Sequence, residues 1–432
     1  MRGKYTMKKD TVIQFENPAK KIVEDALTGF IRESAQKMLH KAIESEVAEF
    51  MLRYEDEQLS NGHKRLVRNG YHAERTIQTG VGSLELKVPR VRDRDIGNNE
   101  KIEFTSKLVP KYMRRTVTLD VLLPILYLKG VSTGDFPDAL APLLGEQAKS
   151  ISPSVISRLK DSWYDDYQQW QKRDLSSTRY VYWWVDGIYT SVRAEPEKIC
   201  MLLIVGATET GKKELIGMAD GFRESRESWL ELLSDLKRRG LMMGAKLAIG
   251  DGALGFWSAL PSIYPDIKHQ RCWVHKTRNV LDKLPKSVQA KAKSMLHDIY
   301  LAETQEDALS AFNQFIKHYQ LKYPKATECL AKDEKALLTF YDFPAEHWQH
   351  IRTTNPIEST FATIRHRTKK SRGCFSRETI IACVFKLACE AEKRWKRLYG
   401  YKRLAEVINL VKFIDGVSEY EMNKNVKKLA AA

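Results

Sequence analysis

Residues 180–187 of this chain read YVYWWVDG, six β-branched or aromatic residues followed by an acid and a glycine. The composition of the first six residues predicts a buried strand, and Asp186 follows it directly. A second apolar run at residues 246–250, KLAIG, precedes Asp251 in the same way. If the two strands are neighbours in one sheet, the two acids can meet. Converging carboxylates bind divalent cations, which can drive phosphoryl transfer.

Five strand candidates follow one another between residues 177 and 271. They cover residues 179–185, 199–205, 214–218, 246–249 and 267–270, with helices expected at 227–239 and 253–260. The first three strands can form an antiparallel meander, and the last two can join through helical crossovers. We therefore expect an α/β core with a mixed five-stranded sheet, the pattern of a ribonuclease H-like domain. The strands before Asp186 and Asp251 should then be neighbours.

Both aspartates precede glycine, and Asp-Gly is also a common turn after a strand. Spacing alone leaves the turn and the metal ligand open. Asp220-Gly221 serves as an internal control. It follows the third strand, which should lie at the sheet edge, so Asp220 should lie too far away to join the pair.

The remaining segments are predicted to be mainly helical. Residues 1–115 contain a long helix at 18–58, a small β hairpin at 74–79 and 83–88, and an exposed linker at 90–99. Three short helices at 116–176 form either a helix-turn-helix DNA-binding domain or a packing unit without DNA contact. Residues 272–350 are too long for a plain loop and are expected to be an α-helical insertion. Residues 351–422 complete the core, and 423–432 form a frayed tail.

Glu358 opens a predicted helix in the segment Asn355-Pro356-Ile357-Glu358. With Asn355 as N-cap, Glu358 is the third helical residue and can act as a capping glutamate. A helix start also keeps a carboxylate ionised, which suits a metal ligand. The two interpretations remain open at this stage.

The formal net charge of +16 indicates a polyanionic partner. A basic cluster follows Glu358 and is interpreted as phosphate-binding rather than as a solvated helix end. Its members are Arg365, Arg367, Lys369, Lys370 and Arg372.

Cys272 and His275 form a single Cys-x-x-His directly after the fifth strand. One such pair is half a zinc site, and no second pair has matching spacing. We expect no zinc and a structural or auxiliary role for both residues. His275 could still contact substrate phosphate.

Other classes of protein are disfavoured. No apolar run of about eighteen residues predicts a membrane span, and the basic N-terminus lacks the apolar stretch of a secretory signal. The six cysteines do not suggest a disulfide framework. The expected location is the cytoplasm, in association with the nucleoid. No Gly-rich Lys-Ser/Thr phosphate loop is present, and the tryptophans at 183, 184, 229, 257 and 273 are expected in the core.

Four short motifs in this order resemble the Mutator-like family of insertion-sequence DDE transposases. They are residues 185–189 (VDGIY), 250–252 (GDG), 270–276 (QRCWVHK) and 355–359 (NPIES). The resemblance covers about residues 60–400 and implies a ribonuclease H-like fold with a helical insertion before the glutamate.

The resemblance further implies that Asp186, Asp251 and Glu358 form a catalytic triad that binds two Mg²⁺ ions, with Mn²⁺ able to substitute. One ion would activate water or a DNA 3′-hydroxyl, and the other would stabilise the leaving oxygen. It also implies that the N-terminal region binds double-stranded terminal inverted repeats, that target DNA is a second partner, and that a homo-oligomer, expected to be a dimer, acts on paired ends.

Two rival functions are weighed against a transposase. A plain ribonuclease H-like nuclease would cut without joining, but the large N-terminal region and the insertion argue against so small a design. A non-catalytic DNA-binding regulator derived from a transposase would have no reason to keep all three acids.

Overall fold

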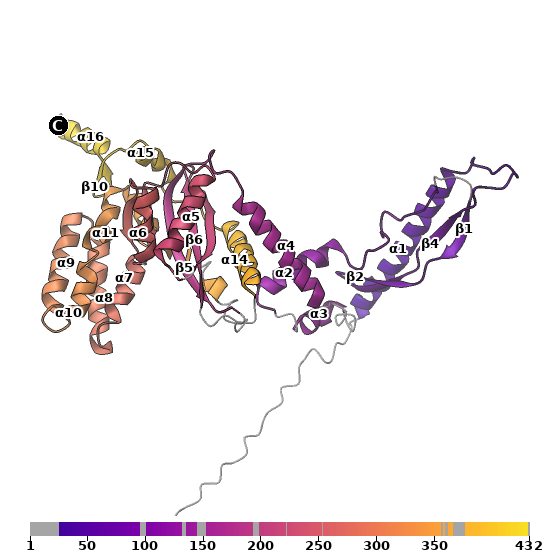
Figure 1. Ribbon diagram of the computed structural model, residues 1–432, viewed down its shortest axis with the longest axis horizontal. Helices are drawn as coiled ribbons and strands as arrows, with labels where there is room; N and C mark the ends of the chain where they lie inside the picture. Colours follow the sequence, from indigo (N-terminus) through magenta and orange to yellow (C-terminus); the bar gives the residue numbers. More distant parts are fainter. Residues whose placement is uncertain are drawn as a thin grey trace, which may run out of the picture. The chain divides into compact units, whose positions relative to one another are not determined.

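The computed structural model describes residues 26–95, 101–131, 135–144, 153–192, 198–221, 223–252, 254–355, 357–358, 362–365 and 376–430. The chain forms two compact units, residues 1–159 and 160–432. Both units are drawn in Figure 1, and each is described here by itself.

The second unit is built on a five-stranded mixed sheet. Its strands are β5 (Tyr180–Thr190), β6 (Ile199–Thr208), β7 (Lys213–Gly221), β8 (Leu247–Gly250) and β9 (Lys268–Arg271). Their order is β7-β6-β5-β8-β9. The pairs β5–β6 and β6–β7 are antiparallel, whereas β5–β8 and β8–β9 are parallel. The predicted meander followed by two crossover strands is confirmed, and β5 and β8 are neighbours as expected.

The apolar face of the sheet explains why this segment folds as it does. Helices α5 (Arg226–Arg238) and α6 (Leu254–Ile263) lie side by side over it (Figure 1). Alternate β5 residues, Trp183 and Val185, enter the same core as Leu233 and Leu236 of α5. The side chains of every second β5 residue thus pack against the apolar side chains on one face of α5. The five tryptophans expected in the core are all buried.

The opposite face of β5 carries the other alternate residues. The Tyr182 hydroxyl lies 2.8 Å from Nδ1 of His347, and Trp184 Nε1 donates to the carbonyl of His350 at 2.9 Å. These partners belong to the segment that precedes Glu358. Because Asp186 continues the series of Tyr182 and Trp184, its side chain belongs to this face.

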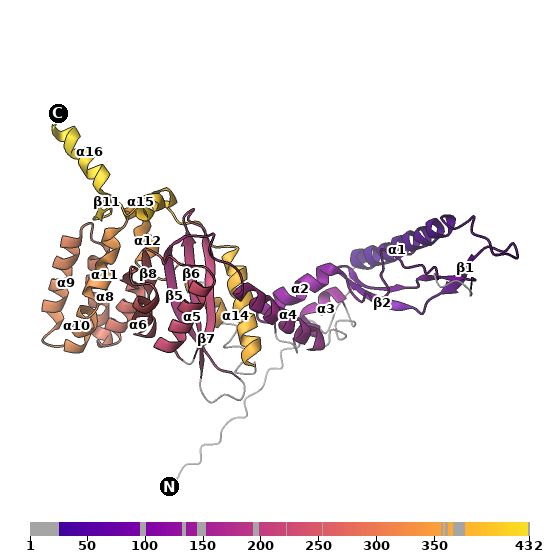
Figure 2. The same cartoon turned by 45° about the horizontal axis from the view of Figure 1, so that its top comes forward.

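Residues 272–350 contain helices and no strand, as predicted. The helices are α7 (Trp273–Leu281), α8 (Lys286–Leu301), α9 (Gln305–Tyr319), α10 (Pro324–Ala331) and α11 (Glu334–Leu338), then the 3-10 helices η3 (Thr339–Asp342) and η4 (Ala345–His347) and the start of α12 (Trp348–Ile351). Figure 2 shows them bundled beyond β8, and α11 contacts β9.

The C-terminal part is mainly helical. It comprises α14 (Arg377–Glu392), which packs against β7, then η5 (Tyr401–Arg403), α15 (Leu404–Ile408), the hairpin β10 (Phe413–Ile414) and β11 (Val417–Ser418), and α16 (Glu419–Ala430). The frayed tail predicted at 423–432 is wrong for residues 423–430, which continue α16. Ser418 accepts from the Glu421 N–H at the start of this helix, and Arg403 pairs with the Glu421 carboxylate.

The first unit combines α1 (Ala26–Leu52) with two antiparallel pairs, β1 (Leu66–Tyr71) with β4 (Pro89–Asp93) and β2 (Arg75–Thr79) with β3 (Gly82–Leu86). Helices α2 (Val117–Leu128) and α3 (Phe136–Leu144) follow, and α4 (Pro153–Gln171) leads into the second unit. The hairpin at 74–88 is confirmed.

The exposed linker predicted from residue 90 is wrong as far as Asp93, because this segment is strand β4. Its charges hid the strand pattern. The Asp93 carboxylate is buried and pairs with Arg65 at 3.0 Å, which offsets part of the cost of burying an acid in a strand. Residues 97–99 of the predicted linker lie outside the described residues.

The packing of α5 generates a stability prediction. Leu236→Ala should lower the free energy of unfolding by about 2–5 kcal/mol, because a fully buried leucine leaves a cavity. The nine tryptophans all lie between residues 163 and 395, so urea unfolding followed by tryptophan fluorescence reports the second unit. Met242→Ala, at a 69% exposed position, should change the free energy by about 0.5 kcal/mol or less. Equal losses in the two variants would contradict the assignment of this core.

Candidate active site

Strand pairing places Asp186 beside Asp251. In the parallel ladder of β5 and β8, Val185 is opposite Gly250, and each aspartate is the next residue in the chain. Neighbouring strands lie about 4.8 Å apart, so the two carboxylates start from adjacent backbone positions. Strand β8 ends at Gly250, whereas β5 continues to Thr190. Asp186 is therefore a strand residue, and of the two interpretations left open the simple turn after a strand does not apply to Asp186-Gly187.

One carboxylate oxygen of each aspartate accepts a hydrogen bond from the backbone N–H of the glycine that follows it. The Gly187 N–H donates to Asp186 Oδ1 at 2.8 Å, and the Gly252 N–H donates to Asp251 Oδ1 at 2.6 Å. The other Asp186 oxygen, Oδ2, is buried and has no hydrogen-bond partner in the described structure. The Arg365 guanidinium lies 3.9 Å from this oxygen. A buried carboxylate oxygen left in this state is suited to a ligand such as a metal ion.

The electrostatics of the pair follow from burial. The Asp186 side chain is only 10% exposed. Burial, with a smaller contribution from the negative charge of Asp251, raises the pKa of Asp186 to about 6, although His275 and Arg365 oppose the shift. The two carboxylates therefore lie in one electrostatic environment. Hard divalent cations such as Mg²⁺ and Mn²⁺ favour carboxylate oxygens of this kind.

Cys272 joins the two halves of the candidate site. Its N–H donates to the carbonyl of Gly250 at 2.8 Å, immediately before Asp251. Its Sγ accepts from the Thr354 N–H at 3.3 Å and lies 3.4 Å from Thr354 Oγ1. Cys272 thus links the end of β8 to the start of the helical segment that carries Glu358. Cys272, for which a structural or auxiliary role was expected, therefore contacts Thr354.

His275 lies on α7, one helical turn after Cys272. Burial alone would lower its pKa, but the Cys272 thiol and the negative charges of Asp251 and Asp186 raise it to about 9. An imidazolium beside the aspartates offsets part of their charge. His275 therefore belongs to the electrostatic surroundings of the acid pair.

The helix of Glu358 begins one residue earlier than predicted. The Glu358 N–H donates to the Thr354 carbonyl at 3.1 Å, so Thr354 is the N-cap and Asn355 the first helical residue. Glu358 is then the fourth helical residue, one position beyond that of a capping-box glutamate. Ile357 and Ile364 are buried, whereas Ala362 and Arg365 are exposed, so the expected outward face is present.

The three predicted acids are not assembled into one cluster. Among the residues that the structure describes, no three His, Cys, Asp or Glu side chains are placed to hold one metal ion. Asp186 and Asp251 come together, and Glu358 stands on a helix whose start contacts Cys272. Asp220 lies on edge strand β7, two strands from β5, where it pairs with Arg377. Arg365 lies beside Asp186, whereas Arg367, Lys369, Lys370 and Arg372 lie outside the described residues.

Sequence reasoning missed Glu224, between β7 and α5. Burial, followed by the charges of Asp186 and Asp251, raises the pKa of this carboxyl to about 7. A lone glutamate before a helix carries no sequence signal for this location. Gly187 was the available clue, since glycine in a strand often marks a close approach by another group.

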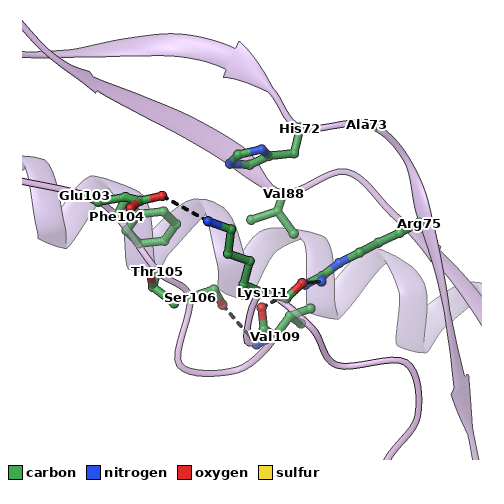
Figure 3. A pocket seen from close by; sticks show the side chains of 10 residues that line it. All are labelled: His72, Ala73, Arg75, Val88, Glu103, Phe104, Thr105, Ser106, Val109 and Lys111. Atoms are coloured by element: carbon green, nitrogen blue, oxygen red, sulfur yellow. Dashed lines mark hydrogen bonds and ion pairs between the residues drawn. The ribbon is translucent and has the colours of Figure 1, made fainter.

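A pocket of about 230 Å³ lies in the first unit (Figure 3). Lys111 and Glu103 form an ion pair at 3.6 Å there. Arg75 donates to the carbonyls of Val109 and Pro110 at 3.0 and 2.9 Å. The basic side chains of this pocket, Lys111 and Arg75, already bind other groups of the protein. We therefore assign the pocket no ligand.

The amino-acid sequence matches a known protein family over most of its length. Residues 6–398 match the family model described as "Transposase, Mutator family". The chain belongs to the Mutator family of transposases. The motifs that suggested this family, and the β5–β8 aspartate pair, all lie within the matched residues.

Several relatives of this chain are named as transposases for insertion sequence elements. The chain is 49% identical to the transposase for insertion sequence element IST2 of Acidithiobacillus ferrooxidans, over 65% of this chain and 95% of that protein. It is 50% identical to the transposase for IS6120 of Mycolicibacterium smegmatis, over 64% and 84%. It is 32% identical to the transposase for IS256 in transposon Tn4001 of Staphylococcus aureus, over 77% and 82%.

In this Mutator-family chain, no helix among the described residues is long and apolar enough to cross a membrane.

The Cys272 contacts generate a prediction. Cys272→Ala should lower the free energy of unfolding of the second unit by about 1–3 kcal/mol, because the buried Thr354 N–H loses its acceptor. Cys272→Ser keeps an acceptor and should lose less. Urea unfolding by tryptophan fluorescence measures both. Cys329→Ala, at a half-buried thiol, is the control. A Cys272→Ala loss no larger than that of Cys329→Ala would refute the link.

Proposed function

We propose that this chain is the DNA transposase of an insertion sequence and that Asp186, Asp251 and Glu358 carry its reaction. The observation that carries the proposal is the aspartate pair directly after the ladder between β5 and β8, with a buried Asp186 oxygen that lacks a hydrogen-bond partner among the described residues. The relatives named as insertion-sequence transposases support the substrate class. The strand order supports assigning the core to the ribonuclease H-like class.

The chemistry of the acid pair fits a divalent cation, since both side chains offer carboxylate oxygens. One of these oxygens, Asp186 Oδ2, has no hydrogen-bond partner among the described residues. Asp186 and Asp251 would hold the ion, and Glu358 would complete its ligands from the neighbouring helix. Two bound Mg²⁺ ions, or Mn²⁺ in their place, would supply an activated oxygen nucleophile and stabilisation of the leaving 3′-oxygen. No zinc is assigned to Cys272 and His275.

The protein's own residues orient the DNA. Arg365 is more than half exposed and stands 3.9 Å from Asp186 Oδ2, where its guanidinium can hold the phosphate beside the acids. Arg367, Lys369, Lys370 and Arg372 follow it in sequence and are assigned to the DNA backbone. His275 keeps a positive charge beside the aspartates and limits their mutual repulsion. Cys272 holds the start of the Glu358 helix through Thr354, and Asn355 is the first residue of that helix.

The proposal also covers the DNA sites that the protein binds, its oligomeric state and its location. The N-terminal region would bind the terminal inverted repeats, and the core would act on element ends and target DNA. A dimer would pair the two ends. The protein would act in the cytoplasm, on the nucleoid.

Replacement of single acids tests the function. Asp251→Asn should abolish both strand cleavage and joining, because the carboxylate that faces Asp186 is lost, while folding and DNA binding persist. The measurement is joining of a labelled element-end duplex to plasmid with Mg²⁺ or with EDTA. Asp220→Asn, on the edge strand, is the matched control and should keep activity. Glu358→Gln should also be inactive.

The outcomes separate three functions. Metal-dependent joining that Asp251→Asn cannot perform supports the transposase. Cleavage without joining would indicate a nuclease, and binding with neither activity would indicate a regulator. Full activity of Glu358→Gln would remove Glu358 from the reaction.

The raised pKa of Asp186 predicts how pH controls metal binding. Without metal, a carboxyl whose folded pKa is about 6 contributes stability below its ordinary value near 4, and that contribution is lost as pH rises through 6. Protons therefore compete with the cation. Mg²⁺ at tenfold excess over its Kd should stabilise the protein by about 1.4 kcal/mol at pH 8 and by much less at pH 5. Melting temperatures with and without Mg²⁺ measure this, and an equal gain at both pH values would contradict the site.

A further inference from the structure

Glu224 is held in a defined position between β7 and α5. The preceding residue, Arg223, has φ of 59°, in the left-handed region that few non-glycine residues adopt. The following residue, Ser225, caps α5 by accepting from the Ser228 N–H at 3.2 Å. The chain therefore turns sharply before Glu224 and is fixed directly after it.

Two glycines make room for Glu224. A Cβ on Gly187 would lie 2.1 Å from Glu224 Oε1, and a Cβ on Gly255 would lie 2.0 Å from the Glu224 carbonyl oxygen. The contact at Gly255 is with backbone and excludes a side chain there, whereas a side chain at position 187 would displace the Glu224 carboxylate from its place. The carboxylate thus occupies the place that a β5 side chain next to Asp186 would fill, which is a physical reason for glycine at position 187.

The sheet geometry lets this carboxylate share the edge with the aspartates. Gly187 belongs to the α5 face of β5, whereas Asp186 belongs to the opposite face. The ladder between β5 and β8 ends at the pair of Val185 and Gly250. Beyond that pair no β8 residue separates the two faces, so groups from both faces can meet at the strand ends.

The charges place Glu224 in the same electrostatic environment. Both Asp186 and Asp251 contribute to the raised pKa of Glu224, after burial. Its nearest side-chain donor is the Cys200 thiol, with Sγ 3.9 Å from Oε1, which is long for a hydrogen bond. Glu224 thus adds a third carboxylate to the surroundings of the aspartate pair, in which the buried Asp186 Oδ2 has no hydrogen-bond partner among the described residues.

Building on the proposed function, we propose that Glu224 is a fourth acidic residue of the active site, which positions the hydrated divalent cation held by Asp186 and Asp251. Mg²⁺ usually keeps several water ligands and takes only one or two carboxylates directly. Glu224 accepts hydrogen bonds from that water. This role agrees with its approach from the face opposite Asp186, and it makes Glu224 a positioning residue.

Direct ion binding by the full-length protein without DNA tests this role. Mn²⁺ is titrated, and the free hydrated ion is measured by electron paramagnetic resonance. Glu224→Gln should weaken Mn²⁺ binding by about tenfold or more, as loss of an outer-sphere partner does. Glu227→Gln, an exposed acid three residues away on α5, is the matched control and should bind as wild type. Asp251→Asn should lose binding.

Folding is checked by urea unfolding in EDTA. Glu224→Gln should be at least as stable as wild type there, because it removes one of three mutually repelling acids. Lower stability in EDTA would make Glu224 a structural residue and overturn the proposal. Wild-type Mn²⁺ affinity in Glu224→Gln, with binding lost in Asp251→Asn, would overturn the role of Glu224 and leave the proposed function intact. Absence of Mn²⁺ binding by wild type, or unchanged binding by Asp251→Asn, would remove the metal site itself.

Discussion

The parallel pairing of β5 with β8 is the constraint on which the candidate active site depends. It sets Val185 opposite Gly250, and so it brings two acids 65 residues apart to adjacent positions. The pairing is held by the core on the α5 face, where Trp183 and Val185 are buried, and by Trp184 and Tyr182 on the other face. A slip of one residue would reverse the face of every β5 side chain and remove Asp186 from Asp251.

The surroundings of the pair balance burial against charge. Taking carboxylates out of water disfavours their ionised form, as the raised pKa values of Asp186 and Glu224 record. His275 and Arg365 supply the opposing positive charge. Cys272 adds a mechanical link, since it touches the backbone before Asp251 and the N-cap before Glu358. Acid pair, basic neighbours and helix start are therefore parts of one arrangement.

The sheet was predictable from sequence because its central strands β5, β6 and β8 are apolar runs buried on both faces, and the strand order followed from the connections between them. The pairing of Asp186 with Asp251 could be predicted for the same reason. Strand β4 could not, because its arginines and Asp93 hide the alternation until Arg65 pairs with the buried acid. The extension of β5 past Asp186 was missed because Asp-Gly is typical of turns.

Glu224 shows a different limit. Its burial depends on the missing Cβ of Gly187, more than thirty residues earlier in the chain, and on a left-handed backbone at Arg223. Local patterns carry neither fact. The helix start moved from Asn355 to Thr354 for a similar reason, since a tertiary contact with Cys272 fixes the N-cap.

The most direct test of the account is a crystal structure of the protein with an element-end duplex and Mn²⁺, with the ions located by their anomalous scattering. The account predicts Mn²⁺ bound by carboxylate oxygens of both Asp186 and Asp251, next to the phosphate at the element end. Mn²⁺ and that phosphate bound elsewhere, with the two aspartates free of metal, would contradict it.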